Sequence, residues 1–175
     1  MIITHKFRLY PSTKQEEKLL EILELCRQTY NTLLEELNNQ KIKDKLQIQS
    51  TLPNLKIFEP RLKKVYAKTL QYECYRLFSN LSALRQLKKN KKKVGRLRFK
   101  GKGWFKTINL NQSGFSFEQN GKKGILHLSK IGDIKVKAHR EVGGKIKQIM
   151  IKKSNNKYYA TIITNAKIVL SCGNK

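Results

Sequence analysis

Acidic residues are scarce in this chain of 175 residues, which has 12 Asp and Glu against 38 Lys and Arg and a formal net charge of +26. So large an excess of one sign makes a free surface repel itself, and a bound polyanion relieves that repulsion. Nucleic acid is the usual polyanion, and a basic stripe is its electrostatic footprint. The composition therefore favours nucleic-acid binding over the alternative of a chain that is only generically rich in lysine.

Cysteines and long apolar runs are scarce as well. Cys26, Cys74 and Cys172 are odd in number and widely spaced, and they form neither a CxxC motif nor a Cys/His cluster. We therefore expect no disulfide framework and no zinc site, and we expect Cys26 and Cys74 to be core residues. No run of about 18 apolar residues occurs, so we expect a soluble, intracellular protein with no membrane partner.

Catalytic motifs are also missing. The sequence has no nucleophile elbow, no P-loop and no HExxH metal pair. Two-metal hydrolysis needs several converging carboxylates, whereas Glu118, Asp133 and Glu141 each stand alone in the sequence. The three histidines are scattered and are interpreted as strand or surface residues. We therefore expect no catalytic residue, no metal and no cofactor, and we interpret the chain as a non-enzyme.

The residues that are present predict an α+β chain. Residues 1–10 alternate in character and read as a strand that ends before Pro11. Apolar residues then recur every three or four positions from Leu19 to Leu37, which indicates a helix of about seven turns. A polar connection with one short helical piece covers residues 38–56, and a second helix runs from Pro60 to about Lys89. The two long helices are predicted to form an antiparallel hairpin with facing apolar stripes.

Beyond residue 94 the pattern changes to short strands. Strands are expected at 105–110, 114–118, 124–128, 133–136, 146–152 and 158–164, with hairpin signals at Asn120-Gly121, Gly143-Gly144 and Asn155-Asn156. Strands this short and this close suggest a small, twisted, OB-like barrel that includes the first strand. The expected organisation is a first barrel strand (1–10), an inserted helical hairpin (11–94), the rest of the barrel (95–165) and a tail (166–175).

The densest positive charge lies between the two predicted regions. From Lys88 to Lys102, nine of fifteen residues are Lys or Arg and none is acidic. Phe99, Trp104 and Phe105 are interleaved with these cations, and unpaired bases stack on such aromatic rings. The alternative is that Phe99 and Phe105 belong to the barrel core and that the lysines are a solvated surface. The predicted RNA-binding cations of this run are Lys88, Lys89, Lys91, Lys92, Lys93, Arg96, Arg98, Lys100 and Lys102, with Trp104 as the stacking residue.

Five stretches in a fixed order resemble one family. They are KFRLYPS (6–12), CRQTYN (26–31), RLRFKGKG (96–103), LSKIGDIKVKAHREVGGKIKQIMIKK (128–153) and YYATI (158–162). Together they are similar to the N-terminal half of TnpB (OrfB), the RNA-guided nuclease of bacterial and archaeal insertion sequences. The resemblance covers about residues 1–165. It implies a wedge-like barrel with a helical recognition insert, in which the protein reads shape and a short DNA motif while base pairing reads the sequence.

The resemblance also implies roles for particular residues. Lys6 and Arg8, together with Arg96, Arg98, Lys100 and Lys102, match basic family positions near RNA. Gln71 matches a helix-borne glutamine that faces the DNA motif, with Lys64 or Lys68 one turn before it, although a solvent-facing filler remains the alternative for Gln71. Thr107 and Asn109 fall in a strand that carries small polar contacts to the motif.

The sequence departs from the family after residue 162. The family continues into a RuvC-like nuclease domain with a catalytic Asp, whereas this chain reads TNAKIVLSCGNK, has no acid after Glu141 and lacks the zinc-ribbon cysteines. Ser129 also stands where the family usually has Pro. The chain is interpreted as a truncated or decayed copy, an isolated domain, or a nuclease-free binder of guide-type, transposon-end-derived RNA, with duplex DNA as an additional ligand.

Two alternatives stay open at this stage. One is a basic structural protein of the ribosomal or nucleoid type. The other is the binding half of a split nuclease, whose nuclease domain is encoded separately. The expected location in each case is the cytoplasm of a prokaryotic cell, where association with the nucleoid is compatible with the charge.

Overall fold

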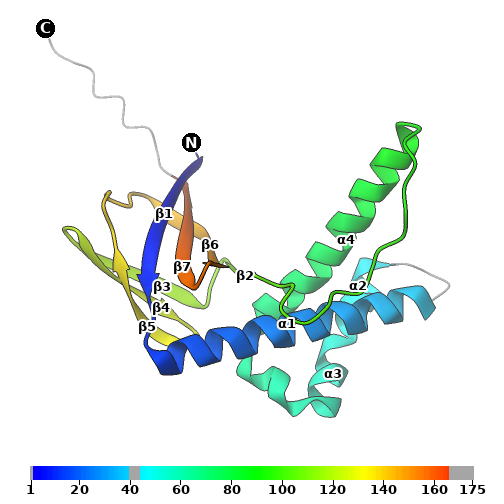
Figure 1. Cartoon of the computed structure of the whole chain (residues 1–175), viewed down its shortest axis with the longest axis horizontal. Coiled ribbons are helices and arrows are strands. Elements are labelled where there is room, and N and C mark those ends of the chain that lie inside the picture. Colours follow the sequence, from blue (N-terminus) through cyan, green and yellow to red (C-terminus); the bar gives the residue numbers. More distant parts are fainter. Residues whose placement is uncertain (1, 40–43, 166–175) are drawn as a thin grey trace, which may run out of the picture. The chain divides into compact units, whose positions relative to one another are not determined.

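The computed structural model describes residues 2–39 and 44–165 (Figure 1). The chain forms two compact units. The sheet unit comprises Met1–Ser12 and Asn109–Lys175, and the helical unit comprises Thr13–Ile108. The helical unit is therefore inserted in the sequence after the first strand of the sheet unit. Its second boundary falls inside a strand rather than at residue 94, where the composition changes, and the expected tail at 166–175 lies outside the described residues.

The sheet contains seven antiparallel strands, and each of the seven strands expected from the sequence is present with small shifts at its ends. Their order across the sheet is β2-β6-β7-β1-β5-β4-β3. The strands are β1 (Ile2–Tyr10), β2 (Thr107–Asn111), β3 (Phe115–Asn120), β4 (Lys123–Leu128), β5 (Gly132–Lys137), β6 (Lys145–Ser154) and β7 (Lys157–Asn165).

The expected closure into a barrel is wrong for the described strands, because β2 and β3 remain at opposite ends of the strand order. The connection between them explains why they do not pair. Gln112 donates its N–H to the Lys147 carbonyl (2.9 Å), and the Gly114 carbonyl accepts the N–H of Ser129 (2.8 Å). These bonds lead the chain from the neighbourhood of β6 to that of β4, so consecutive strands occupy different edges of the sheet.

Two of the three expected hairpin turns are confirmed. Asn155 and Asn156 have φ angles of 46° and 58° and join Ser154 to its partner Lys157, as a type I′ turn requires. Gly121 has a φ of 59° in the two-residue connection between Asn120 and Lys123. The signal at Gly143-Gly144 is not a hairpin turn, because β5 pairs with β1 and β4 whereas β6 pairs with β7.

The helical unit consists of α1 (Thr13–Asn39), α2 (Lys45–Ser50), α3 (Leu52–Phe58), the 3₁₀ turn η1 (Pro60–Lys64) and α4 (Ala67–Lys89). Helix α1 packs against α4. The connection holds two short helices where one was expected. The second long helix begins later than expected, because Val65 and Tyr66 are extended, with ψ angles of 138° and 131°, and separate η1 from α4.

The core of the helical unit lies along α1 and the first half of α4. The apolar stripe expected for α1 is buried, and Tyr30, Leu33 and Leu34 are among its fully enclosed residues. On α4 the buried residues end at Leu77, so the far end of the expected stripe contributes little to the core. Cys26 and Cys74 are buried free thiols, as expected, and Cys172 lies outside the described residues.

Candidate nucleic-acid interface

The basic segment, residues 88–104, leaves the end of α4 and contains neither helix nor strand from residue 90 onward. Its cations are exposed except for Lys100, which is half-buried. Because residues 90–104 form neither a helix nor a strand, the path of this segment depends on contacts with the rest of the helical unit. Those contacts concentrate on one residue, Lys100.

Two side chains of α1 hold the backbone of Lys100. The Asn31 Oδ1 accepts the Lys100 N–H (2.8 Å), and the Asn31 Nδ2 donates to the Lys100 carbonyl (3.0 Å). The same carbonyl accepts a hydrogen bond from Arg27 Nη1 (2.6 Å). Asn31 therefore accepts from and donates to the backbone of Lys100, as a neighbouring β-strand would. Arg27, one helical turn earlier, adds a third hydrogen bond, and we call these three bonds the anchor at Lys100.

Arg27 is fixed in turn by Glu24 on the same helix. Arg27 Nε donates to Glu24 Oε2 (2.9 Å), and Nη2 donates to the other carboxylate oxygen. This bidentate pairing lowers the pKa of Glu24 and raises the pKa of Arg27. One edge of the guanidinium is therefore held by the carboxylate, while Nη1 is directed at the basic segment.

Beyond Lys100 the chain makes a tight turn that presents an aromatic ring. The N–H of Trp104 bonds to the Gly101 carbonyl (3.2 Å), and Gly103 has a φ of 71°, a left-handed conformation that suits glycine. Lys100 Nζ lies 5.4 Å from the centroid of the Trp104 ring. Trp104 is 65% exposed and Phe99 is 57% exposed. Both rings are therefore open to solvent among the cations.

Phe105 has a different role from Phe99 and Trp104. It is 7% exposed, and its ring meets the Tyr30 ring edge-on at 5.7 Å and lies 4.5 Å from the Arg76 guanidinium. Arg76 also donates Nη2 to the Thr107 carbonyl (3.3 Å). Phe105 is thus a core residue of the helical unit, and the expectation that it stacks with bases is wrong. It serves as the second anchor of the basic segment.

A buried carboxyl group lies next to this anchor. Glu73 is fully buried, and its Oε2 is 3.3 Å from Arg76 Nη1. Burial raises the pKa of Glu73 to about 8, against the lowering effect of Arg76. Burial likewise raises the pKa of the neighbouring Cys26 thiol. The sequence reading did not single out Glu73 or Arg76, because a lone acid three residues before an arginine on a helix looks like a surface pair.

The residues expected to contact a DNA motif lie in η1, on α4 and on β2. Lys64, in η1, donates to Glu21 of α1 (2.7 Å). Gln71 is half-buried on α4 and lines a hollow of about 310 Å³ beside α2 and α3. Lys68 lies one turn before it on the same helix. Thr107 is half-buried, and Asn109 is 2% exposed and accepts a hydrogen bond from Gln148 (3.2 Å).

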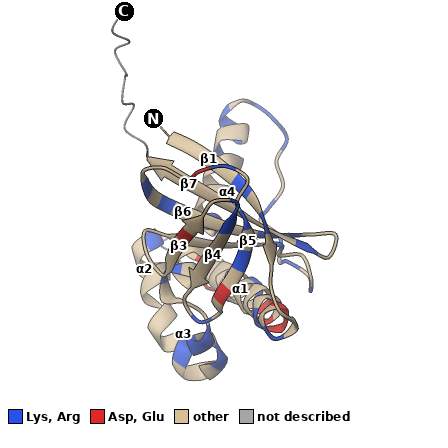
Figure 2. Ribbon diagram, turned by 90° about the vertical axis from the view of Figure 1, so that its left-hand side faces the viewer, with Lys and Arg blue, Asp and Glu red and all other residues tan. Residues whose placement is uncertain are grey.

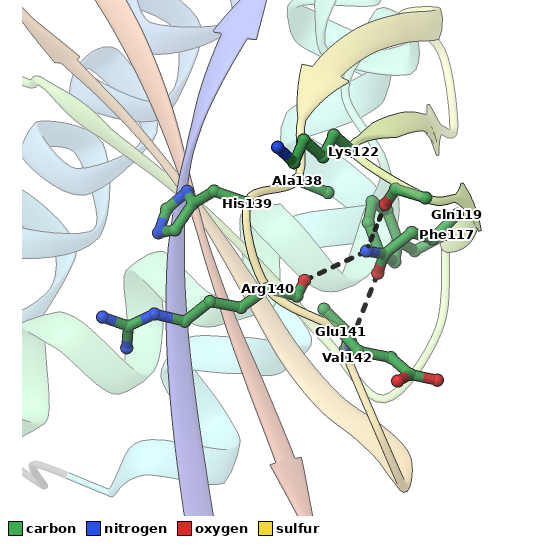
Figure 3. A pocket seen from close by; sticks show the side chains of 9 residues that line it. Phe117, Gln119, Lys122, Ala138, His139, Arg140, Glu141 and Val142 are labelled. Carbon is green, nitrogen blue, oxygen red and sulfur yellow. Dashed lines mark hydrogen bonds between the residues drawn. The ribbon is translucent and has the colours of Figure 1, made fainter.

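The sheet unit carries Lys6, Arg8 and a hollow of about 570 Å³. Gln119 closes one side of this hollow, as Figure 3 shows: its Nε2 donates to the carbonyls of Gly121 (2.8 Å) and Arg140 (3.0 Å), and its Oε1 accepts the N–H of Val142 (3.2 Å). The lining combines Lys122 and Arg140 with Glu141, so its charges are of both signs. Lys6 and Arg8 lie on the other face of β1 from the buried Phe7 and Leu9.

Sequence reasoning missed the two residues that organise the basic segment. Arg27 and Asn31 both lie in the CRQTYN stretch, one turn apart at the edge of the buried stripe of α1. Two polar residues one turn apart beside the apolar stripe of α1 could have indicated a binding role. The sequence does not show, however, which distant backbone atoms they bind. The structure joins this stretch to RLRFKGKG, so two of the stretches behind the family resemblance form one contact.

No helix in the described part of the chain is long and apolar enough to cross a membrane. Among the same residues, no group of three or more His, Cys, Asp or Glu side chains is arranged to hold a metal ion.

Residues 1–42 match the model of a helix-turn-helix domain of the OrfB family of IS605-type elements. In the described part of that stretch the chain forms β1 and the single continuous helix α1, so two helices joined by a turn are not found there. A search of curated proteins found no significant match. The match therefore supports an N-terminal region similar to that of OrfB/TnpB-type proteins at residues 1–42.

Proposed function

We propose that this chain is a nucleic-acid-binding protein of the transposon-associated OrfB type and that its basic segment binds RNA. The observation that carries the proposal is the anchor at Lys100, where Asn31 and Arg27 fix the backbone while the cations and two aromatic rings around it stay exposed. The family match at residues 1–42 supports the same class of ligand.

Anchoring favours binding because a segment with a fixed path loses less conformational entropy when its ligand arrives. The exposed cations of residues 88–102 neutralise phosphates, and Phe99 and Trp104 offer faces on which unpaired bases stack, worth about 1–3 kcal/mol per base. This pairing of cations with exposed rings favours single-stranded RNA regions over a uniform duplex.

The test is RNA binding by the purified chain as a function of salt. Arg96→Gln with Arg98→Gln removes two cations from the basic segment, and Lys14→Gln with Lys18→Gln removes two exposed cations from α1 as the control. We expect the first pair to reduce the slope of log affinity against log salt by about 0.7 for each lost contact to a single strand, and the control pair to leave it unchanged. Equal slopes in all three proteins would contradict the proposal.

The RNA that we propose is guide-like and derived from a transposon end. Purification of the tagged chain from its native cells, followed by sequencing of the bound RNA, should enrich such transcripts over bulk RNA. A profile that matches total RNA, or co-sedimentation with ribosomal subunits, would instead favour a structural role.

We propose further that the surface around Gln71 contacts a duplex DNA motif directed by that RNA. Gln71 and Lys68 lie one turn apart on α4, and Lys64 of η1 is paired with Glu21. Gln71→Ala should then lower RNA-directed DNA binding without changing RNA affinity. A loss of both, or of neither, would remove Gln71 from the interface.

The last part of the proposal is that this chain binds without cutting and acts with a separately encoded nuclease domain. In the sheet unit the acids stand apart: Glu118 is on β3, Asp133 on β5 beside His127, and Glu141 after β5. Incubation of supercoiled plasmid with the pure chain and Mg²⁺ should give no nicking. Nicking by the pure chain would overturn this part and leave the binding proposal standing.

A further inference from the structure

Lysine and arginine are absent from the two edge strands of the sheet, β2 and β3, although each of the five strands between them carries at least one. Edge strands usually carry lysine, proline or a bulge, which keep a second chain from pairing with them. Strand β3 has the sequence FSFEQN and a regular register with β4, so it has none of these three, and Figure 2 shows it without the blue of Lys and Arg. The central residues of β2 are buried, whereas no residue of β3 is. Strand β3 is therefore the unprotected edge.

The register of the β3–β4 hairpin determines which backbone groups of β3 point away from the sheet. Its two-residue turn closes on the pair Asn120 and Lys123, which exchange backbone hydrogen bonds in a hairpin of this kind. Hydrogen-bonded pairs alternate along an antiparallel ladder, so every second residue of β3 directs its N–H and C=O at the open edge. These residues are Phe115, Phe117 and Gln119. Their backbone groups have no backbone partner among the described residues.

The same part of β3 leaves the inner face of the sheet incompletely covered. Leu126 and Leu128 of β4 are fully buried, but the residues opposite them on β3, Phe117 and Phe115, are half-buried. Phe117 stacks on Phe7 at 6.2 Å, so its ring already belongs to this apolar face. A further strand along β3 would cover both half-buried rings and would pair the open backbone groups.

The side chains of β3 fit a second copy of β3. Two antiparallel copies related by a two-fold axis overlap most when the axis passes through Phe117 or through Glu118, because opposed residues must share a face. An axis at Glu118 places two carboxylates opposite each other, which destabilises a sheet. An axis at Phe117 pairs the outward backbone groups of this residue with those of its copy. It also sets the Ser116 hydroxyl opposite Glu118 of the second copy, whose carboxylate can accept its hydrogen bond.

We propose that two copies of this chain associate through their β3 edges, as an antiparallel pair centred on Phe117. The pairing joins the two sheets into one and buries the rings of Phe115 and Phe117. One pair of six-residue strands is a smaller contact than the roughly 1,200 Å² of stable complexes, so the dimer is weak and reversible. The net charge of +26 on each copy opposes the association, and salt screens this repulsion. The inference is independent of the proposed function, because it needs no nucleic acid.

The first test is sedimentation equilibrium of the nucleic-acid-free full chain at 0.1 M and 1 M NaCl. We expect the dissociation constant of the dimer to fall about tenfold or more at the higher salt, because the Debye length falls from about 10 Å to about 3 Å. Phe115→Pro removes an outward N–H at the first residue of β3, a position that tolerates proline, and should abolish the dimer. The control, Phe115→Val, keeps this N–H and an apolar side chain and should still dimerise. Melting temperatures check that both variants are folded.

The second test is cysteine pairing, which probes the register while the phenylalanines stay in place. Ser116→Cys and Glu118→Cys are made separately, each with Cys172→Ser, so that the other cysteines, Cys26 and Cys74, are buried. In the proposed register the two new cysteines face each other in a pair without backbone hydrogen bonds. The Cα atoms of such a pair lie about 4.5 Å apart, which a disulfide can span. Mild oxidation of an equal mixture should therefore give mostly mixed disulfide-linked dimers.

The outcomes decide between this pairing and its alternatives. Mostly mixed dimers support the axis at Phe117. Glu118→Cys linked mainly to itself would mean that the axis lies at Glu118, and equal amounts of all three products would mean random collision; either result overturns the proposal. Wild-type protein that stays monomeric at both salt concentrations, or Phe115→Pro that dimerises as well as Phe115→Val, overturns it too and leaves the edge to an extended segment of a different protein. None of these results bears on RNA binding by the basic segment.

Discussion

The two units differ in the balance between basic and acidic residues. The helical unit has 23 basic and 9 acidic residues, and its ion pairs join Glu24 to Arg27, Glu21 to Lys64 and Glu59 to Arg61. The buried Glu73, whose pKa is raised to about 8, contacts Arg76. The sheet unit has 15 basic residues against 3 acidic ones, and its pair within the described residues joins Asp133 to His127. The difference teaches that acids in the helical unit fix particular arginines in structural roles, whereas the sheet unit has too few acids to pair with most of its cations.

The largest effect is expected from the buried acid of the helical unit. The pKa of Glu73 is raised from 4.5 to about 8, so its contribution to stability is fully present below pH 4.5 and is lost as pH rises toward and through 8. The loss approaches about 1.4 kcal/mol per pH unit at its steepest. Glu73→Gln should remove this dependence and exceed the wild type in stability at pH 8.

Urea unfolding followed by circular dichroism at pH 5, 6.5 and 8 measures this effect. The control is Glu17→Gln, which changes an exposed acid on α1 and should keep the wild-type pH dependence. Parallel pH profiles for wild type and Glu73→Gln would show that Glu73 does not titrate in this range.

The second prediction concerns apolar packing in the sheet unit, where ion pairs contribute little. A Cβ at Gly124 would lie 2.9 Å from the Phe117 ring and 3.3 Å from the Glu118 carbonyl oxygen. Phe117 stacks on Phe7 at 6.2 Å, so a movement of its ring away from the new methyl group would disturb this contact. Gly124→Ala should therefore destabilise the protein by about 1–3 kcal/mol.

Thermal unfolding of Gly124→Ala is compared with that of Gly95→Ala, whose new Cβ would meet no atom within 4 Å. The Gly95 variant should be neutral or slightly stabilised. Equal melting temperatures for the two variants would contradict this prediction and would mean that Phe117 moves aside without cost.

The third prediction tests whether the side chain of Asn31 holds the basic segment in place. Asn31→Ala removes two hydrogen bonds to Lys100, and we expect a loss of roughly 1–2 kcal/mol together with greater mobility of the basic segment. Trp104 is the chain's single tryptophan, so its fluorescence anisotropy reports on this segment directly. Thr32→Ala, which removes a hydroxyl bonded within α1, serves as the control and should leave the anisotropy unchanged.

The smallest effect is expected from relieving the repulsion in the sheet. Lys137→Thr removes the cation that faces both Lys123 and Arg8, and each like-charged neighbour costs about 0.2–1 kcal/mol. The variant should melt slightly above the wild type at low salt, and the difference should vanish at high salt because ions screen exposed charges. A lower melting temperature at low salt would mean that repulsion among Lys123, Lys137 and Arg8 does not destabilise the sheet.

The local structure could be predicted from the sequence because the apolar residues of the main elements recur with a clear period. Alternation in β1 and the three-to-four spacing from Leu19 to Leu37 are set by which face is buried, and the structure follows both. Pro60 was expected to begin the second long helix. It begins a 3₁₀ turn instead, and α4 starts only after the extended residues Val65 and Tyr66. Short-range signals of this kind leave a boundary uncertain when two helical forms compete.

The long-range features could not be predicted in the same way. Whether the sheet closes depends on backbone bonds such as Gln112 to Lys147, which no side-chain pattern encodes. The anchor at Lys100 joins residues 69 and 73 positions apart in the sequence. Phe105 illustrates the same limit, since an aromatic residue in a basic run stacks on a ligand or fills a core according to what the fold places beside it.

The anchor at Lys100 has one more consequence. Asn31 and Arg27 bond only to main-chain atoms there, so the fastening does not depend on which side chain occupies position 100. Proline alone would be rejected outright, because it has no N–H to give to Asn31. The charge and shape displayed along this stretch can therefore be exchanged over evolution or by design, and the helical scaffold that supports it need not be rebuilt.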